Sequence, residues 1–338
     1  MQSVIFNGIR DVDLTMKPVP TPEGGDVLVK VKKAGICGTD VAAYKYGGEH
    51  ASIQAGDEFG HEMVGEIVSL GKDVSQFKEG DRVFVNPQYF QRMDTKHRGG
   101  AFSEYVLVHD AKLDFNLFML PDNLSYDDAV LIEPFSVGIH GKNIPNVTAD
   151  SKVVIFGSGT IGLSALTGVI ASGVKNPVLT DIDPKRLKTA EELGATTYLT
   201  STDSEFNDFL IGHFGESFSM IRGSVSDADV YIDCAGAPTI YQSYSNLAKN
   251  GAYLSVVASH HKDNLVNFKD LMWGEQKIVG SFMYNTNDIK EAIQILSDGK
   301  TKITSIITQK YPQSQAKEAL EIASDTSQSI KVVIDYDL

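Results

Sequence analysis

A glycine-rich turn between an apolar strand and an apolar helix constrains the fold of this chain more than any other feature. It lies in KVVIFGSGTIGLSALTGVIASG, residues 152–173, where three glycines have the spacing G-x-G-x-x-G. In such a turn Gly157 bends the chain tightly, Gly159 lets a pyrophosphate approach the backbone, and Gly162 lets the helix pack closely on the strand. The helix N-terminus then faces the phosphates. The segment predicts the first strand and helix of a dinucleotide-binding domain.

Strands and helices alternate beyond this turn. NPVLTDID is typical of a buried strand, and PKRLKTAEELGA of a helix opened by Pro184 in its first turn. The segments ADVYIDCAG, TIYQSYSNLAKNG and AYLSVVAS continue the pattern. This alternation predicts a doubly wound parallel sheet of the Rossmann type.

An acidic residue closes the second predicted strand. Asp181 follows Gly162 by about 20 residues, where a carboxylate accepts hydrogen bonds from ribose hydroxyls and repels a 2′-phosphate. NAD is therefore the expected cofactor, although Arg186 could receive a phosphate, flank the adenine ribose or lie in solvent. The predicted cofactor contacts are Gly157, Gly159, Thr160, Ile161, Gly162, Asp181 and Arg186.

The two ends of the chain follow a different pattern. Up to about residue 120 the apolar segments are short and alternating, which predicts antiparallel β structure in a partly closed barrel. Ser125 with Asp128 predicts a helix start, and the tail from about Met283 mixes helices and strands that could complete the first domain. We expect a catalytic domain from 1–146 and 283–338 and a nucleotide-binding domain from 147–282.

Charge and composition narrow the possible partners. The 338 residues carry a formal net charge of −14 without a basic run, which argues against nucleic acid and anionic membrane surfaces and favours a small-molecule substrate. No stretch approaches 18 apolar residues and no signal peptide is recognisable, so we expect a cytoplasmic protein. Two cysteines cannot build a disulfide framework.

Four side chains have the chemistry of a zinc site. Cys37 and His61 lie at the ends of adjacent β segments, Glu62 follows His61, and Glu133 lies in the apolar stretch LIEPFSVGIHG. Thiolate, imidazole and carboxylate are zinc ligands, and a catalytic site uses three of them. Neighbours on a strand point to opposite faces, so His61 and Glu62 can share a metal only if the strand ends or bends there. Taken singly, Cys37 would more readily be a buried thiol, His61 a core histidine and Glu133 a cap for backbone amides.

Six segments together resemble the zinc-dependent medium-chain dehydrogenases. They are AGICGTD, AGDEFGHEMVGEIVSLG, FKEGDRVFV, GGAFSEYV, LIEPFSVGIHG and VVIFGSGTIGLSA. The resemblance covers essentially the whole chain and is nearest to the sorbitol (polyol), butanediol and sugar-acid dehydrogenase branch. It implies an α/β protein with a GroES-like β-rich catalytic domain from both termini, a Rossmann domain, catalysis in a cleft, and a homodimer or homotetramer.

The resemblance also assigns roles to individual residues. It implies that Cys37, His61 and Glu62 bind one catalytic Zn²⁺, that Glu133 holds or exchanges with the zinc-bound water, and that the Thr39 hydroxyl takes the substrate's proton. Zinc would lower the pKa of an alcohol, whose hydride passes to NAD. The expected reaction is the reversible oxidation of a secondary alcohol of a polyol, vicinal diol or sugar acid.

Departures from the family pattern affect the metal count. The segment NPQYFQRMDTKHRGGAFSEY lacks the four cysteines that hold a structural zinc in many relatives, so we expect one zinc per chain. His97 and Arg98 in this segment could line the substrate site or lie in solvent. Cys234 is interpreted as a core thiol.

Further departures affect the substrate. Ala42 replaces a frequent relay histidine, and Ala43 and Met283 replace a tyrosine and an arginine of polyol-binding relatives, so sorbitol is expected to be a poor substrate at best. The candidates for new substrate contacts are Tyr44, Lys45 and Tyr284.

Two alternatives remain open at this level. One is a zinc-free quinone or enone reductase of the same superfamily, which would use NADPH and need no thiolate. The presence of Cys37, His61, Glu62 and Glu133 together argues against it. The other is a non-catalytic relative that binds the cofactor without turnover. Metal content, NADH titration and a broad alcohol panel distinguish them.

Overall fold

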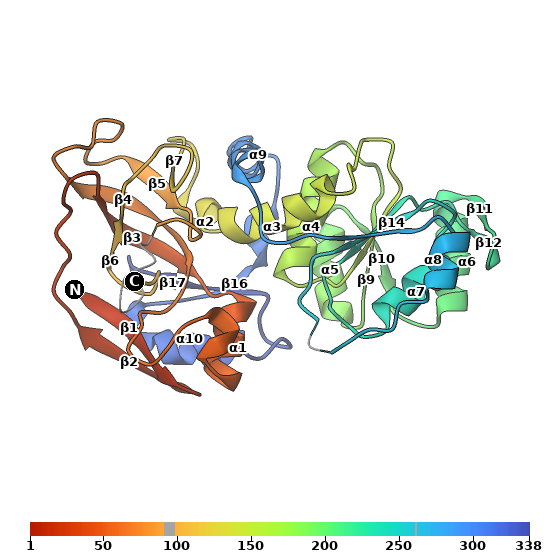
Figure 1. The fold of residues 1–338 in the computed structure, drawn as a ribbon, viewed down its shortest axis with the longest axis horizontal. Coiled ribbons are helices and arrows are strands. Elements are labelled where there is room, and N and C mark those ends of the chain that lie inside the picture. The colour runs from red at the N-terminus through yellow and green to blue at the C-terminus, as the bar shows by residue number, and fades with distance from the viewer. Residues whose placement is uncertain (91–98, 261) are drawn as a thin grey trace. The chain divides into compact units, whose positions relative to one another are not determined.

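The computed structural model describes residues 1–90, 99–260 and 262–338, in which the chain folds into two compact units (Figure 1). Unit 1 comprises Met1–Glu133 and Thr304–Leu338, and unit 2 comprises Pro134–Ile303. His97 and Arg98 lie outside the described residues.

Unit 1 is built around a seven-stranded sheet that is mostly antiparallel. Its strand order is β16-β17-β3-β4-β5-β7, and β6 pairs with β3. The strands of unit 1 are β1 (Gln2–Gly8), β2 (Asp11–Met16), β3 (Val27–Gly35), β4 (Glu62–Leu70), β5 (Arg82–Val85), β6 (Tyr105–Val108), β7 (Leu117–Met119), β16 (Ile307–Tyr311) and β17 (Lys331–Asp335). Its α-helices are α1 (Gly38–Tyr46), α2 (Tyr126–Ala129) and α10 (Ala316–Ala323), and its 3₁₀ turns are η1 (Gly48–Ala51) and η3 (Gln313–Gln315).

The C-terminal segment joins the sheet that the N-terminal segment begins. Strand β17 lies antiparallel to β3, with Gly35 opposite Val333 and Lys33 opposite Asp335. The C-terminal strand β17 thereby lies next to the end of β3, two residues before Cys37.

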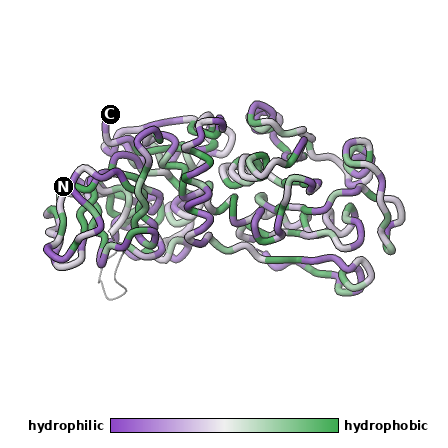
Figure 2. The backbone as a smooth tube through the Cα atoms, turned by 90° about the horizontal axis from the view of Figure 1, so that it is seen from above, coloured by the Kyte–Doolittle hydropathy of each residue, from purple (hydrophilic) through white to green (hydrophobic). Residues whose placement is uncertain are grey.

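Alternation in the strands supplies the core of unit 1. In β3 the side chains of Val27, Val29 and Val31 are fully buried, because successive residues of a strand point to opposite faces and one face packs inward. Hydrophobic and hydrophilic stretches alternate along the chain (Figure 2).

As expected, Ser125 caps α2 by accepting a hydrogen bond from the Asp128 amide at 3.0 Å.

Unit 2 contains a six-stranded parallel sheet, as the alternating sequence predicted. The strand order is β10-β9-β8-β13-β14-β15, so the order reverses between β8 and β13. These strands are β8 (Val153–Phe156), β9 (Val178–Asp181), β10 (Thr196–Leu199), β13 (Val230–Asp233), β14 (Tyr253–Val256) and β15 (Lys277–Gly280). The helices are α3 (Ile132–Asn143, which begins in unit 1), α4 (Thr160–Ala171), α5 (Pro184–Leu193), α6 (Asp203–Phe214), α7 (Ile240–Leu247), α8 (Phe268–Trp273) and α9 (Thr286–Ser297), with the 3₁₀ turn η2 at Ile303–Ile306.

One element of unit 2 was not expected. An antiparallel hairpin of β11 (Glu216–Ser219) and β12 (Gly223–Ser226) lies between α6 and β13. Among the residues described, every helix is too short or too polar to cross a bilayer.

Candidate functional site

Three of the predicted zinc ligands lie together in unit 1. Candidate ligand atoms of Cys37, His61 and Glu62 all lie within 4.8 Å of one another. Cys37 lies two residues after the end of β3 and directly before the first residue of α1, while Glu62 is the first residue of β4. The pairing of β3 with β4 sets Gly35 opposite Glu62 and so brings the two chain segments together. A thiolate, an imidazole and a carboxylate converging in this way match the donor set of a catalytic zinc site.

The beginning of β4 explains how two consecutive residues can face one metal. His61 precedes the strand, and Gly60 before it has a φ of +82°. Backbone with positive φ turns the chain and strongly favours glycine. His61 therefore does not follow the strand alternation that would point it away from Glu62.

Asp40 orients the His61 ring. Its Oδ1 lies 3.1 Å from Nδ1 of His61, and its Oδ2 accepts a hydrogen bond of 2.9 Å from the Cys37 amide. A proton on Nδ1 leaves Nε2 available for a metal. Burial alone would lower the pKa of His61, but the charges of Asp40 and Cys37 outweigh burial and raise this pKa well above its usual range. The role of Asp40 was not predicted from the sequence, although an acid at the third position of a helix is a recognisable capping signal.

Thr39 is exposed in the first turn of α1, beside the same ring. Its hydroxyl lies 3.5 Å from Nε2 of His61. A hydroxyl at this position can exchange a hydrogen bond with a group bound next to the histidine.

Glu133 is buried but lies outside the three-residue group. It occupies the first turn of α3. The buried Lys331 of β17, which the sequence analysis did not single out, forms an ion pair with Glu62 and donates a 3.0 Å hydrogen bond to the Ile36 carbonyl. Burial opposes the charge of Lys331, yet Glu62, Cys37 and Glu133 together raise its pKa.

The glycine-rich turn of unit 2 has the geometry that its spacing predicts. Gly157 has a φ of +97°, and Gly159 is the N-cap of α4. A Cβ on Gly162 would overlap the carbonyl oxygen of Gly157, so α4 can approach β8 only with glycine there. Thr160 and Ile161 form the first turn of α4, and the N-terminus of a helix is a favourable place for an anion.

Asp181 closes β9 and is tied to the same turn. Its Oδ2 accepts hydrogen bonds from the Ser158 amide at 2.6 Å and the Ser158 hydroxyl at 2.8 Å, and its Oδ1 accepts one from the Asp183 amide at 2.9 Å. A carboxylate offers about four acceptor positions, so Asp181 has capacity for a further donor. Nη1 of Arg186 would lie 3.5 Å from a Cβ on Gly159, which places the guanidinium beside the turn.

Comparison with known proteins assigns the family. Residues 23–121 match the alcohol dehydrogenase GroES-like domain, and residues 160–298 match the zinc-binding dehydrogenase family. Sorbitol dehydrogenase of Bacillus subtilis is 30% identical to this chain over an alignment that covers 99% of this chain and 97% of the relative. The chain belongs to the zinc-dependent medium-chain dehydrogenase family. Within it, the chain falls in the sorbitol and polyol branch and is an oxidoreductase acting on CH–OH groups.

Solved structures agree with this fold. An alcohol dehydrogenase from Escherichia coli in complex with NADH is 25% identical, with a TM-score of 0.84 and coverage of 99% of both chains. A zinc-binding dehydrogenase from Sinorhizobium meliloti bound to NADP is also 25% identical, with a TM-score of 0.80 and coverage of 99% of this chain and 98% of that chain. The GroES-like and Rossmann folds expected from the sequence are confirmed.

The three predicted substrate contacts of this medium-chain dehydrogenase have different surroundings. Tyr44 is fully buried in the core of unit 1 and donates a 2.8 Å hydrogen bond to Glu321. Lys45 is half-buried, with Nζ 5.4 Å from the centre of the Tyr46 ring. Tyr284 is buried in unit 2.

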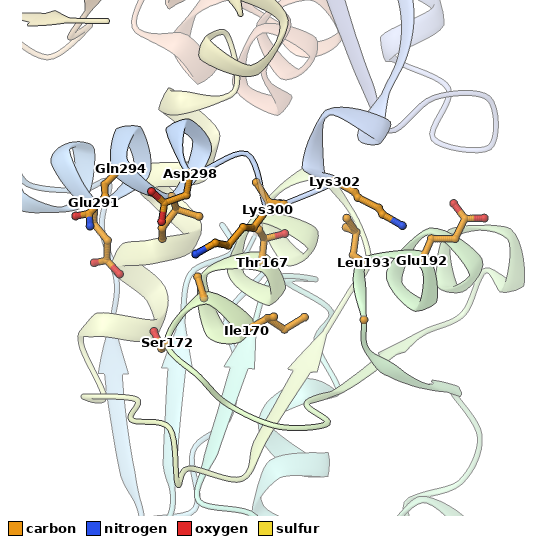
Figure 3. Close-up of a pocket in the computed structure, with 14 residues that line it drawn as sticks. Thr167, Ile170, Ser172, Glu192, Leu193, Glu291, Gln294, Asp298, Lys300 and Lys302 are labelled. Carbon is orange, nitrogen blue, oxygen red and sulfur yellow. The ribbon is translucent and has the colours of Figure 1, made fainter. Parts of the chain in front are cut away.

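A cavity in unit 2 lies apart from the predicted cofactor residues. Its volume is about 500 Å³, and it lies between the C-terminal parts of α4, α5 and α9 (Figure 3). Lys300 and Lys302 face it together with Glu192 and Asp298. None of the predicted site residues lines this cavity. Cys234, directly after β13, is half-buried, and burial raises the pKa of its thiol, which fits the interpretation as a structural thiol.

Proposed function

We propose that this enzyme catalyses the reversible NAD-dependent oxidation of a secondary alcohol flanked by further hydroxyls, at a single zinc bound by Cys37, His61 and Glu62. The observation that supports this most directly is the convergence of these three side chains in a chain of the polyol branch. The catalytic domain would comprise 1–146 and 283–338 and the nucleotide-binding domain 147–282.

The residues around the metal position would have different roles in the reaction. Zinc would act as a Lewis acid that lowers the pKa of the substrate hydroxyl. Thr39 would accept the proton of that hydroxyl, since its own hydroxyl lies beside His61. Asp40 would keep Nε2 of His61 directed at the metal. Glu133 would hold the water that substrate displaces. With Ala42 in place of a relay histidine, the proton would leave by another route.

The proposed preference for NAD rests on Asp181. Its carboxylate retains acceptor capacity for a ribose hydroxyl beside the glycine-rich turn, and its charge would repel a 2′-phosphate. Arg186 beside Gly159 could offset part of that repulsion. The two nicotinamide-bound relatives carry different cofactors, so this preference needs its own measurement.

The proposed substrate class rests on the polyol branch to which the chain belongs and on two positions where its sequence departs from polyol-binding relatives. Relatives in the branch are sorbitol dehydrogenases, but Ala43 and Met283 offer no polar group to a long polyol chain. A site that pairs hydroxyls discriminates strongly, whereas apolar contacts discriminate weakly. Selectivity would then depend on the groups beside the reacting carbon. The candidates for these contacts are Tyr44, Lys45 and Tyr284, of which Lys45 would favour an acid end group.

A steady-state screen tests the proposal. The values of kcat/KM with NAD are compared for sorbitol, 2,3-butanediol, idonate, galactonate and ethanol. A diol or aldonic acid should be the best substrate. A clear optimum for sorbitol or for ethanol would contradict the substrate assignment. Reduction of quinones or enones with NADPH in zinc-depleted enzyme would instead favour the zinc-free alternative.

A homodimer is the proposed minimal assembly in the cytoplasm. Strand β15 forms one edge of the unit 2 sheet, and Leu265, Phe268 and Phe282, which lie before and after it in the chain, are strongly exposed. An open strand edge with neighbouring apolar side chains is suited to pairing with a second copy. Light scattering of the purified enzyme would detect a monomer, dimer or tetramer.

A further inference from the structure

The buried cation beside the metal position has no role in the reaction as described so far. Lys331 is 2% exposed and Glu62 is 1% exposed, and the two form an ion pair. Removing two charges from water is unfavourable unless their geometry and further hydrogen bonds compensate. The remaining hydrogen bond of Lys331 goes to the Ile36 carbonyl at 3.0 Å, directly before Cys37. The cation is thus held by the candidate ligand Glu62 and by the residue that precedes the candidate ligand Cys37.

The backbone is shaped to accommodate this pair. A Cβ on Gly35 would overlap the Glu62 carboxylate and lie 2.9 Å from Cε of Lys331. Strands β3, β4 and β17 meet at this point, since Gly35 lies opposite both Glu62 and Val333. Glycine at position 35 therefore leaves the space in which Lys331 reaches Glu62.

The positive charge of Lys331 offsets part of the negative charge of the candidate metal ligands. Lys331 and Glu62 are both almost completely buried, so solvent screens their ion pair only weakly. A thiolate and a carboxylate together carry the two negative charges that would neutralise a divalent ion. A fixed ammonium on Glu62 reduces the charge that this carboxylate gives to the metal.

We propose that Lys331 is a positioning residue of the metal centre that holds one oxygen of Glu62 in a buried ion pair and so keeps Glu62 a partly neutralised, exchangeable ligand. This inference rests on the proposed function in taking Glu62 as a ligand. A metal with such a ligand retains net positive charge toward the substrate oxygen. The ion pair with Lys331 would also make it easier for Glu62 to leave the metal when substrate binds.

Lys331→Met tests the proposal by removing the charge while retaining length and apolar contacts. Without the ammonium, Glu62 should bind the metal more strongly, so zinc affinity in a chelator competition should rise at least about tenfold, equivalent to roughly 1.4 kcal/mol. The Co²⁺-substituted enzyme should show a changed visible d–d spectrum, which a purely structural lysine would not affect. The value of kcat should fall.

The chain contains a matched control for a lost buried lysine. Lys33 lies on β3, is largely buried and pairs with Asp335 of β17 and, at 3.2 Å, with Asp127. Lys33→Met should weaken folding in the same sheet without changing zinc affinity or the cobalt spectrum. Lys331→Arg keeps the charge and should retain values close to wild type. If Lys331→Met unfolds, Lys331→Gln keeps donors for Glu62 and Ile36 and should give the same rise in affinity.

The outcomes separate this inference from the proposed function. A folded Lys331→Met or Lys331→Gln enzyme with wild-type zinc affinity and cobalt spectrum overturns the inference, whatever its activity. An equal shift in Lys331→Arg overturns it too, because charge would then not be the cause. If the affinity and spectrum change as expected but the wild-type enzyme oxidises no alcohol, the role of Lys331 stands and the proposed reaction fails.

Discussion

Asp40 contacts the His61 ring and would thereby set the direction of the proposed bond from His61 to the metal. Replacing Asp40 with Asn keeps the shape but removes the charge that holds the Nδ1 proton. Loss of such a partner typically weakens metal binding by about 10–100-fold. We therefore expect Asp40→Asn to lower zinc affinity by about that factor and to reduce kcat, as measured by chelator competition and steady-state kinetics.

A second aspartate in unit 1 serves as control. Asp26 is buried and contacts Nδ1 of His109 at 3.1 Å, the same separation as in the Asp40 pair, but it lies away from the three ligands. Asp26→Asn should change stability and leave zinc affinity unchanged. Equal losses in both variants would mean that the effect of Asp40→Asn comes from misfolding.

We expect Asp181 to determine the preference for NAD over NADP. Asp181→Ala removes both the ribose acceptor and the repulsion of a 2′-phosphate, so the ratio of kcat/KM for NAD over NADP should narrow by at least about tenfold, or roughly 1.4 kcal/mol. Asp183→Ala removes a nearby acid that caps α5 through the Lys185 amide, and it should leave that ratio unchanged. Wild-type enzyme that favours NADP would contradict the interpretation of Asp181.

Residue type and order predicted the ligand candidates but not the groups that support them. Cys37, His61 and Glu62 are recognisable because thiolate, imidazole and carboxylate are uncommon in apolar β segments. Lys331 is not recognisable in this way, since only the β3–β17 pairing brings it to Glu62 from the other end of the chain. The burial of Tyr44 was likewise not predictable, because the sequence does not show which face of α1 packs inward.

The packing of α4 against β8 depends on the absence of a side chain at Gly162. It sits where α4 crosses the end of β8, and any side chain would meet the Gly157 carbonyl. Overpacking of this kind costs about 1–3 kcal/mol. Gly162→Ala should lower the free energy of unfolding by that amount in urea titrations, and it should weaken NADH binding because the turn that faces the phosphates is displaced.

Gly212 provides the matched comparison within the same unit. It is exposed in α6, and a Cβ there would meet nothing within 4 Å. Alanine is favoured over glycine in a helix by about 1 kcal/mol, so Gly212→Ala should stabilise the protein and leave NADH binding intact. Stabilisation by both variants would show that the Gly162 contact is not tight in solution.

The elements of unit 2 were more predictable than those of unit 1. Local patterns suffice for a strand, a turn and a helix such as β8 and α4, where apolar periodicity, glycine spacing and capping agree. The β11–β12 hairpin was missed because ESFS and GSVS carry little apolar alternation. The bend before β4 that lets His61 and Glu62 converge was stated only as a condition, since a single glycine does not fix a strand boundary.

At the scale of the whole molecule, the two chemistries belong to different compact units. Cys37, His61 and Glu62 all lie in unit 1, whereas the glycine-rich turn and Asp181 lie in unit 2. Each unit has its own sheet and core. Loss of the metal should therefore affect the two units unequally.

Metal removal tests this division. We expect the native enzyme to contain one zinc per chain by elemental analysis and to lose activity on chelation while still binding NADH with nearly unchanged affinity, because every predicted cofactor contact lies in unit 2. Zinc at 100 times its Kd would stabilise the folded state by about 2.7 kcal/mol, so calorimetry should show the transition of unit 1 rising with added zinc. Cys37→Ser should abolish that rise without altering NADH fluorescence titrations. Two zincs per chain, or loss of NADH binding together with the metal, would contradict the assignment of one metal site confined to unit 1.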